Sequence, residues 1–214
     1  MKHTLRGLIS AAFVLAFAGM GIAQTPAAAP PAAPPAAGRG GPPRPVLWVT
    51  SSAFPDGGFI PMHNAGRGEN KSPAFEFHWN LGLNPGTAPD TLKTYAVILH
   101  DMENSTAKGT VDTLHWSAFN IPGSAQGLAE GLGSGDLPDG TRNGPGISNR
   151  NGNPGAYFGP GAGPGPIHHY VFEFYALDTK LDLPATATRD ELLKAMEGHV
   201  IGKAAWTGRF PQPQ

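Results

Sequence analysis

Two apolar runs decide the fold class of this chain. The first is Tyr95–Leu99, with the sequence YAVIL, and the second is Tyr170–Leu177, with the sequence YVFEFYAL. Continuous runs of this length, rich in β-branched and aromatic residues, are typical of strands that are covered on both faces. Similar short runs alternate with Gly, Pro and Asn turns, and they predict strands at 46–50, 58–61, 75–79, 94–100, 114–121 and 170–177. The pattern predicts a fold dominated by β-strands, with 170–177 as a central strand.

The composition agrees with a loop-rich β fold and argues against several functions. The 214 residues include 30 Gly and 23 Pro, which break helices and favour turns, and 40% of the residues are hydrophobic, enough for a packed core. The net charge is -1, with no basic block of the kind that neutralises nucleic-acid phosphates. The lack of cysteine excludes disulfides, thiol nucleophiles, thiolate metal ligands and a lipid-anchored export signal.

One helix is expected near the C-terminal end. The segment Thr188–Glu191 has the pattern of a capping box, in which the first and last side chains each bond the other's backbone amide. Apolar residues at 192, 193 and 196 follow at helical spacing, and Gly198 is suited to end the helix. The tail 203–210 then predicts an edge strand.

The N-terminal region predicts export. Basic residues at 2, 3 and 6 precede the apolar run Leu8–Ala18, and the small residues Gly21 and Ala23 favour cleavage after Ala23. A retained anchor is the alternative, but the run is shorter than the roughly 20 residues that cross a bilayer. Residues 24–45 are almost all Ala, Pro and Gly, which cannot bury enough surface to fold. We therefore expect a signal peptide at 1–23, a disordered linker at 24–45, a domain at 46–214, and a location in the periplasm or outside the cell.

Polar side chains stand at the ends of three predicted strands. Asp101 follows one apolar strand, His115 lies just inside the next, and His168 precedes the aromatic strand. Rigid strand ends are common places for sites, so a carboxylate and two histidines could form a small polar pocket. Each residue also has a structural alternative: Asp101 could cap a turn, and a histidine could bond a backbone carbonyl in the core. The long Gly-, Pro- and Asn-rich stretch 131–165 favours a functional loop nearby.

Several motifs support a family resemblance by their order and spacing. They are Gly68–Pro73 followed by Trp79, Leu99–Glu103, His115-Trp116 with Asn120–Pro122, Gly155–Pro160, His168–Tyr170, Tyr175–Asp178 and Gly198-His199. From about residue 54 to residue 210, the chain resembles the phosphatidylethanolamine-binding protein family in its bacterial Raf-kinase-inhibitor-like branch. The resemblance implies a β-sandwich with a few peripheral short helices and a small cavity for phosphate-like groups.

The resemblance also implies which residues line that cavity. The expected ligand-binding residues are Asp101, Glu103, His115, Gly159, Pro160, His168 and Tyr170. The family's loop prolines are replaced by Met102 and Ser105, and His169 stands where the family has arginine.

We therefore expect a binding protein for a small anionic ligand or phospholipid head group. We expect no catalytic residue, metal ligand, cofactor or nucleic acid partner, and no transmembrane span after signal cleavage. Two alternatives remain open. One is a hydrolase or metal-assisted enzyme that uses the Asp/His cluster, and the other is an inhibitor or interaction module for a secreted partner.

Overall fold

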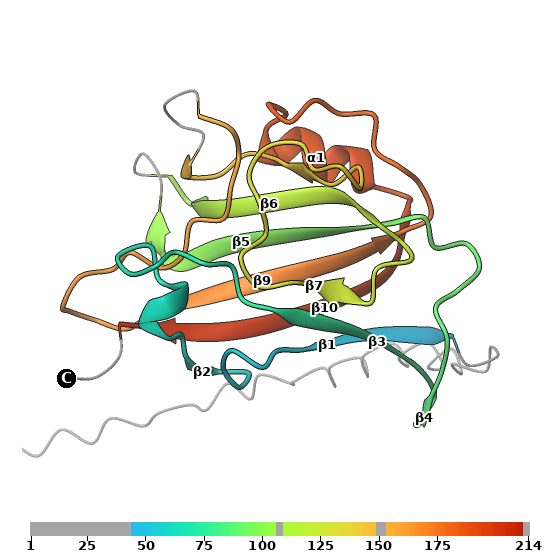
Figure 1. Cartoon of the computed structure of the whole chain (residues 1–214), viewed down its shortest axis with the longest axis horizontal. Coiled ribbons are helices and arrows are strands. Elements are labelled where there is room, and N and C mark those ends of the chain that lie inside the picture. The colour runs from blue at the N-terminus through green and yellow to red at the C-terminus, as the bar shows by residue number, and fades with distance from the viewer. Residues whose placement is uncertain (1–43, 106–108, 149–152, 212–214) are drawn as a thin grey trace, which may run out of the picture. The chain divides into compact units, whose positions relative to one another are not determined.

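A computed structural model of the chain describes residues 44–105, 109–148 and 153–211 (Figure 1). The predicted signal peptide and the linker up to residue 43 lie outside the described residues. Pro45, which we assigned to the linker, is the first residue of strand β1.

The strands form two sheets. One sheet has β3 (Phe75–Leu81) at its centre, paired with β1 (Pro45–Thr50), β4 (Asn84–Pro85) and β7 (Gly127–Leu128). The larger sheet has the order β2 (Gly58–Phe59), β10 (Val200–Phe210), β9 (His168–Leu177), β5 (Thr94–Ser105), β6 (Asp112–Pro122) and β8 (Arg142–Asn143). All pairings are antiparallel except that of β2 with β10.

Aromatic side chains form the core between the two sheets. Alternate residues of β3 point inward, as expected for a strand with one buried face. The ring of Phe75 lies 4.8 Å from that of Phe174, and the ring of Phe77 lies 4.4 Å from that of Tyr95, measured between ring centroids. These contacts fix the smaller sheet on one face of β5 and β9.

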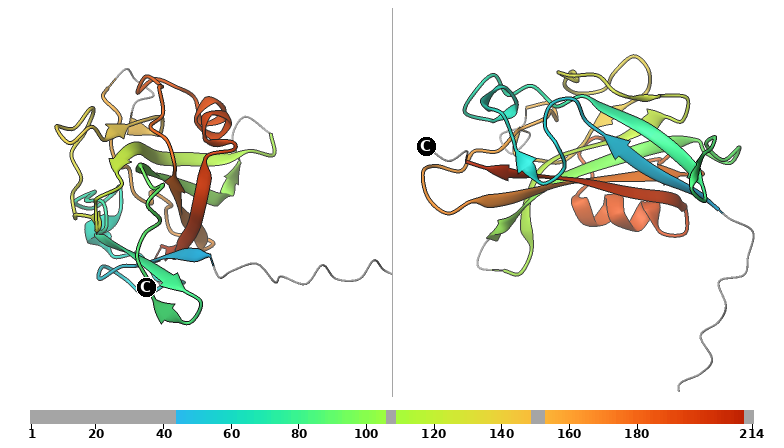
Figure 2. Two further views of the ribbon diagram at one scale, coloured as in Figure 1. Left: turned by 90° about the vertical axis from the view of Figure 1, so that its right-hand side faces the viewer. Right: turned by 90° about the horizontal axis from the view of Figure 1, so that it is seen from below.

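A second hydrophobic cluster covers the opposite face of the larger sheet. It joins Ile98 of β5 and Leu177 of β9 to Leu192 and Met196 of the helix α1 (Arg189–Met196). Figure 2 shows α1 on the side of the larger sheet away from β1 and β3. Strands β5 and β9 are thus buried on both faces, which explains their continuous apolar runs.

The prediction of an all-β dominated fold is confirmed, and the predicted helix is present with its capping box. Each predicted strand is present, although β5 extends to Ser105 and β6 begins at Asp112. The tail was expected to form an edge strand, but β10 lies between β2 and β9. The sequence did not predict the two-residue strands β4, β7 and β8 or the short 3-10 helix η1 (Met62–Asn64). In the described ranges no helix is long and apolar enough to cross a membrane.

Candidate functional site

Three neighbouring strands bring Asp101, His115 and His168 to the same end of the larger sheet. Strand β5, which carries Asp101, lies between β6 and β9. Asp101 stands opposite Thr113 on one side and Tyr170 on the other, so His115 and His168 are each two residues from its direct partners. The structure therefore brings together the three residues on which the predicted pocket depends.

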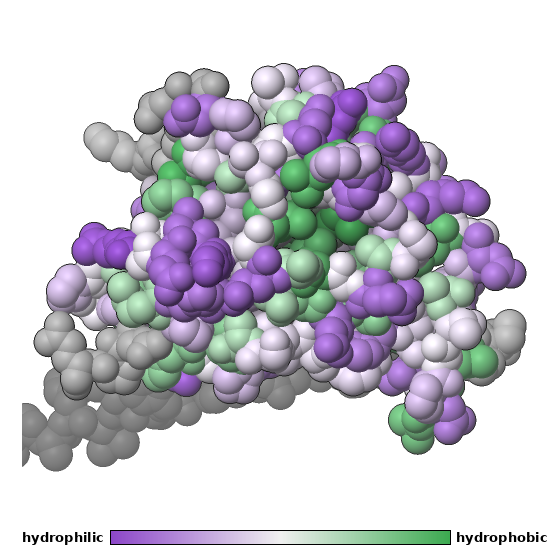
Figure 3. All heavy atoms as spheres, in the orientation of Figure 1, coloured by the Kyte–Doolittle hydropathy of each residue, from purple (hydrophilic) through white to green (hydrophobic). Residues whose placement is uncertain are grey.

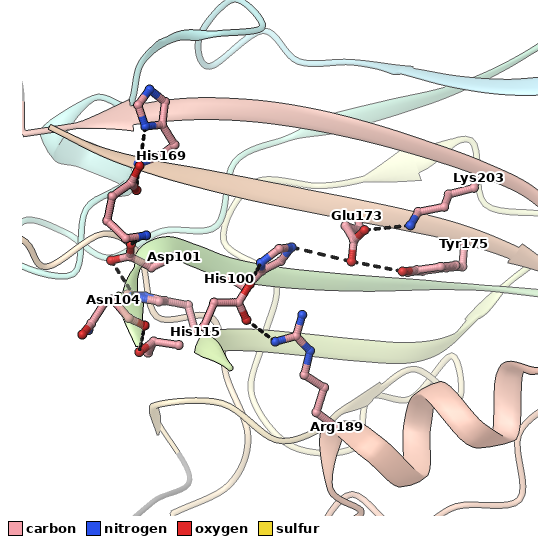
Figure 4. Close-up of polar contacts among 12 residues, drawn as sticks. His100, Asp101, Asn104, His115, His169, Glu173, Tyr175, Arg189 and Lys203 are labelled. Atoms are coloured by element: carbon pink, nitrogen blue, oxygen red, sulfur yellow. Dashed lines mark hydrogen bonds and ion pairs between the residues drawn. The ribbon is translucent and has the colours of Figure 1, made fainter. Parts of the chain in front are cut away.

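Asp101 is the centre of this cluster. Its carboxylate oxygens lie 2.8 and 3.1 Å from Nδ1 of His168, and Oδ2 lies 4.0 Å from Nε2 of His115. Nδ1 of His115 lies 3.0 Å from the carbonyl oxygen of Phe158, which can only accept, so Nδ1 carries the proton. Figure 4 shows the Asp101 carboxylate and the His115 ring facing each other.

Burial within the cluster is uneven. The side chains of Asp101 and His115 are 3% and 4% exposed, whereas that of His168 is 25% exposed. Since Nδ1 of His168 is bonded to Asp101, the atom left for a ligand on the more exposed ring is Nε2. The cluster is thus neither sealed inside the core nor fully solvated.

The Tyr170 hydroxyl lies beside this pair. Burial, together with the Asp101 carboxylate, raises the pKa of Tyr170, so the phenol keeps its proton. In the part of the chain that the structure describes, no hydrogen bond of standard geometry reaches this buried hydroxyl. Its ring lies edge-on to that of His115, with centroids 5.2 Å apart. Its polar neighbours are the Asp101 carboxylate and the backbone of Gly161 and Ala162, so a ligand that reaches this hydroxyl would compete with them.

Glu103 is hydrogen-bonded to His169, the residue that follows His168. Its two oxygens lie 2.6 Å from the His169 backbone nitrogen and 2.7 Å from Nδ1 of the His169 ring. Burial raises the pKa of Glu103, but these hydrogen bonds outweigh it and hold that pKa below its usual value. Asp101, Glu103 and His168 also offer ligand atoms within 4.8 Å of one another, so a divalent cation could compete for the cluster.

Gly159 and Pro160 are buried, and their polar groups bond other loops. The Gly159 N–H donates to Oδ1 of Asn70 at 2.9 Å, and the Pro160 carbonyl accepts from Gly66 at 2.8 Å. The Gly159 amide is therefore already bonded within the chain, although the resemblance implies that Gly159 is a ligand-binding residue. A Cβ on Gly159 would lie 2.0 Å from the Asn64 carbonyl oxygen, so the loop can take this path only with glycine.

Asn70 positions the loop that orients His115, and sequence reasoning did not find this role. Its Nδ2 donates to the Tyr157 carbonyl at 3.2 Å while its Oδ1 accepts from Gly159, so it ties both neighbours of Phe158. The signal was present, because Asn70 belongs to the motif Gly68–Pro73.

Arg67 is a second residue that the sequence did not reveal. Its Nε donates to the Gly161 carbonyl at 2.7 Å, and the backbone of Gly161 and Ala162 is close enough to the Tyr170 hydroxyl to affect its pKa. Arg67 therefore places a cation at the rim of the cluster. Figure 3 shows hydrophilic side chains gathered over η1 and the loop that follows it.

Comparison with known proteins now identifies the family. The family model described as phosphatidylethanolamine-binding protein matches residues 50–211. The chain belongs to this family. It is 40% identical over 163 residues to a UPF0098 protein of Methanothermobacter thermautotrophicus, covering 76% of this chain and 97% of the relative.

Two further comparisons support the assignment. A phosphatidylethanolamine-binding protein homologue from Chlamydia trachomatis has a similar structure, with a TM-score of 0.63 and 27% identity, covering 78% of this chain and 99% of that one. The lipoprotein LppC of Mycobacterium tuberculosis is 30% identical over 77% of this chain and 72% of its own length. The resemblance inferred from the motifs is confirmed.

Proposed function

We propose that this protein is an exported binding protein whose Asp101–His115–His168 cluster holds a phosphate-like group. The observation that carries this proposal is the buried Tyr170 hydroxyl, which has no hydrogen bond of standard geometry within the described residues and whose ring stacks with that of the partly exposed His168. A donor in that position is costly to leave unpaired, and a phosphate oxygen would satisfy it.

The residues around the hydroxyl suit an anion. Nε2 of His168 would contact the anion, while Asp101 orients the ring through Nδ1. Arg67 adds a positive charge at the rim, where its Nε donates to the Gly161 carbonyl. Because no bidentate arginine clamp is involved, we expect weak to moderate affinity.

Tyr170→Phe tests this function, because it removes only the hydroxyl. The protein is titrated by calorimetry with inorganic phosphate and with phosphoethanolamine, and vesicles of phosphatidylethanolamine test whether the source is a lipid head group. We expect about a tenfold loss of affinity in Tyr170→Phe, corresponding to roughly 1.4 kcal/mol. His199→Ala is the control, because His199 is exposed and pairs with Asp178 elsewhere. The proposal fails if wild type binds none of these probes, or if Tyr170→Phe binds them as tightly.

Export has its own support and its own test. The N-terminal pattern predicts cleavage after Ala23, and a relative carries the name of a lipoprotein. The present chain has no cysteine for a lipid anchor. We expect the protein in the periplasmic fraction with an N-terminus at Gln24, which N-terminal sequencing would check.

A metal-assisted enzyme is the second candidate, and one observation favours it. Asp101, Glu103 and His168 offer mixed oxygen and nitrogen ligands within 4.8 Å, a set that suits transition metals. Titration with Mn²⁺ and Zn²⁺ separates the two functions. Stoichiometric binding that Glu103→Gln abolishes, together with turnover of a phosphoester, would favour the enzyme.

A further inference from the structure

The outer edge of strand β3 is paired at both ends but not in its middle. Strand β7 pairs with Phe75 and Glu76, whereas β4 pairs with Asn80 and Leu81. Between these pairings, neither β4 nor β7 pairs with residues 77–79 of β3. We call this part of the edge the gap.

The Phe77 C=O and the Trp79 N–H are the two backbone groups of this gap that lack a partner within the described residues, whereas the other polar group of each residue is bonded. The Phe77 N–H donates to the Gln126 carbonyl at 2.8 Å, and the Trp79 carbonyl accepts from the Gly86 N–H at 2.7 Å. In an antiparallel strand, the N–H and C=O of one residue point to the same edge, so the Phe77 C=O and the Trp79 N–H face this gap as well. Gln126 and Gly86 do not return the second bond, and no other partner for these two groups occurs within residues 44–105, 109–148 and 153–211.

A cavity of about 540 Å³ opens at this gap. The residues that matter for binding are Trp48, His78, Trp79, Thr87, Tyr95 and Gln126, which all line it. The rings of Trp48 and His78 stack with centroids 4.3 Å apart, and Trp79 Nε1 donates to the Tyr95 hydroxyl at 3.0 Å, so these walls are fixed. Such a volume is in the range of small-molecule sites.

We propose that this cavity binds a short extended peptide, one residue of which pairs with His78. The carbonyl before that residue would accept from the Trp79 N–H, and the N–H after it would donate to the Phe77 carbonyl, as in an antiparallel ladder. Its side chain would lie on the face of His78 and Trp48, which favours an aromatic or apolar residue there. Because β4 and β7 close both ends of the gap, a short peptide fits and a long added strand does not.

The peptide site is separate from the anion site. Tyr95, which lines the cavity, lies near the start of β5, and Asp101 follows six residues later. At about 3.3 Å per residue, the two positions on the strand are roughly 20 Å apart. Occupancy of one site can therefore be measured independently of the other.

The test compares two probes that differ in one hydrogen-bond donor. N-acetyl-phenylalanine amide has the N–H that would donate to Phe77, whereas N-acetyl-phenylalanine methyl ester has an oxygen in its place. In NMR titrations we expect the amide to shift the backbone signals of His78 and Trp79 and to bind about fivefold more tightly than the ester.

Two tryptophan substitutions form a test and its matched control. Thr87→Trp fills the cavity and should abolish binding, whereas Leu83→Trp changes a fully exposed residue at the tip of the β3–β4 hairpin and should not. Tyr170→Phe should bind the amide as wild type does. The proposal is overturned if the amide does not bind, if amide and ester bind equally, or if Thr87→Trp leaves binding unchanged.

Discussion

His100 and Asp101 are neighbours in β5, yet they take part in two different polar clusters on opposite faces of the larger sheet. Asp101 faces the candidate site with His168, where a phenol remains without a standard hydrogen bond in the described part of the chain. His100 faces α1, where its Nδ1 bonds Asp112, which also pairs with Arg189 of the helix. Figure 4 shows the His100 cluster and, from the candidate site, Asp101 and His115.

The two clusters differ in what their carboxylates contact. Asp112 and Glu173 pair with Arg189 and Lys203, whereas Asp101 contacts His168 and the Glu103 backbone amide. In the His100 cluster, the second carboxylate, Glu173, contacts Lys203 at 2.7 Å and Tyr175 at 3.0 Å, and it lies 3.6 Å from Nε2 of His100. Each carboxylate in that cluster therefore has at least two partners. We infer that carboxylates held by arginine and lysine serve stability, whereas a carboxylate held by a partly exposed histidine can serve binding.

Breaking the paired cluster should have the largest effect on stability. Asp112→Ala leaves His100 and Arg189 without their shared carboxylate, and removing one partner of a largely buried ion pair costs about 4 kcal/mol. We expect this loss in urea unfolding, with phosphate affinity unchanged in the folded fraction. Lys194→Ala, which breaks an exposed pair with Glu197, should leave stability nearly unchanged. A variant that keeps its stability but loses phosphate affinity would contradict the division between the clusters.

Acid should weaken the paired cluster through Glu173. The ion pair with His100 has the largest effect, and with Lys203 and Tyr175 it outweighs burial and lowers the pKa of Glu173 to about 2 from its ordinary 4.5. The unfolded chain therefore takes up this proton at higher pH than the folded chain. The stabilisation is complete above about pH 4.5 and is lost as the pH falls towards 2, by about 3 kcal/mol.

Glu173→Gln isolates this contribution. The stability difference between wild type and Glu173→Gln, measured by urea unfolding at pH 6, 4 and 2.5, should shrink as the pH falls. A difference that stays constant across this range would show that the Glu173 carboxylate is not linked to folding.

The sequence predicted the elements better than the contacts between them. The apolar runs of β5 and β9 were recognisable because burial on both faces leaves no polar alternation, as at Tyr95–Leu99. The end of β5 was missed because its last four residues are exposed and three of them are polar, although β5 still pairs with β6. Polar, exposed residues carry no hydrophobic period that would indicate a strand.

The candidate site was predictable only in part for a similar reason. Strand ends and family motifs pointed to Asp101, His115 and His168, but the rim depends on contacts far apart in sequence. Asn70 bonds Gly159 across 89 residues, and such pairings follow from three-dimensional packing rather than from local pattern. The alternation of strand residues does imply opposite faces for His100 and Asp101, but the partners of His100 depend on the register of β6 and the docking of α1.

The smallest expected effect concerns phosphate affinity and comes from a comparison of two arginines, one in each cluster. Arg189 donates to a carboxylate and is neutralised, whereas Arg67 donates to the Gly161 carbonyl and keeps its charge available at the rim. Arg67→Ala should therefore weaken phosphate binding by about threefold at low salt, with the difference vanishing as added salt screens the charge. Lys93→Ala removes the same charge from an exposed position just before the other end of β5 and should leave affinity unchanged. If both variants lose affinity equally, net charge rather than the position of Arg67 attracts the anion, and the rim has no specific role.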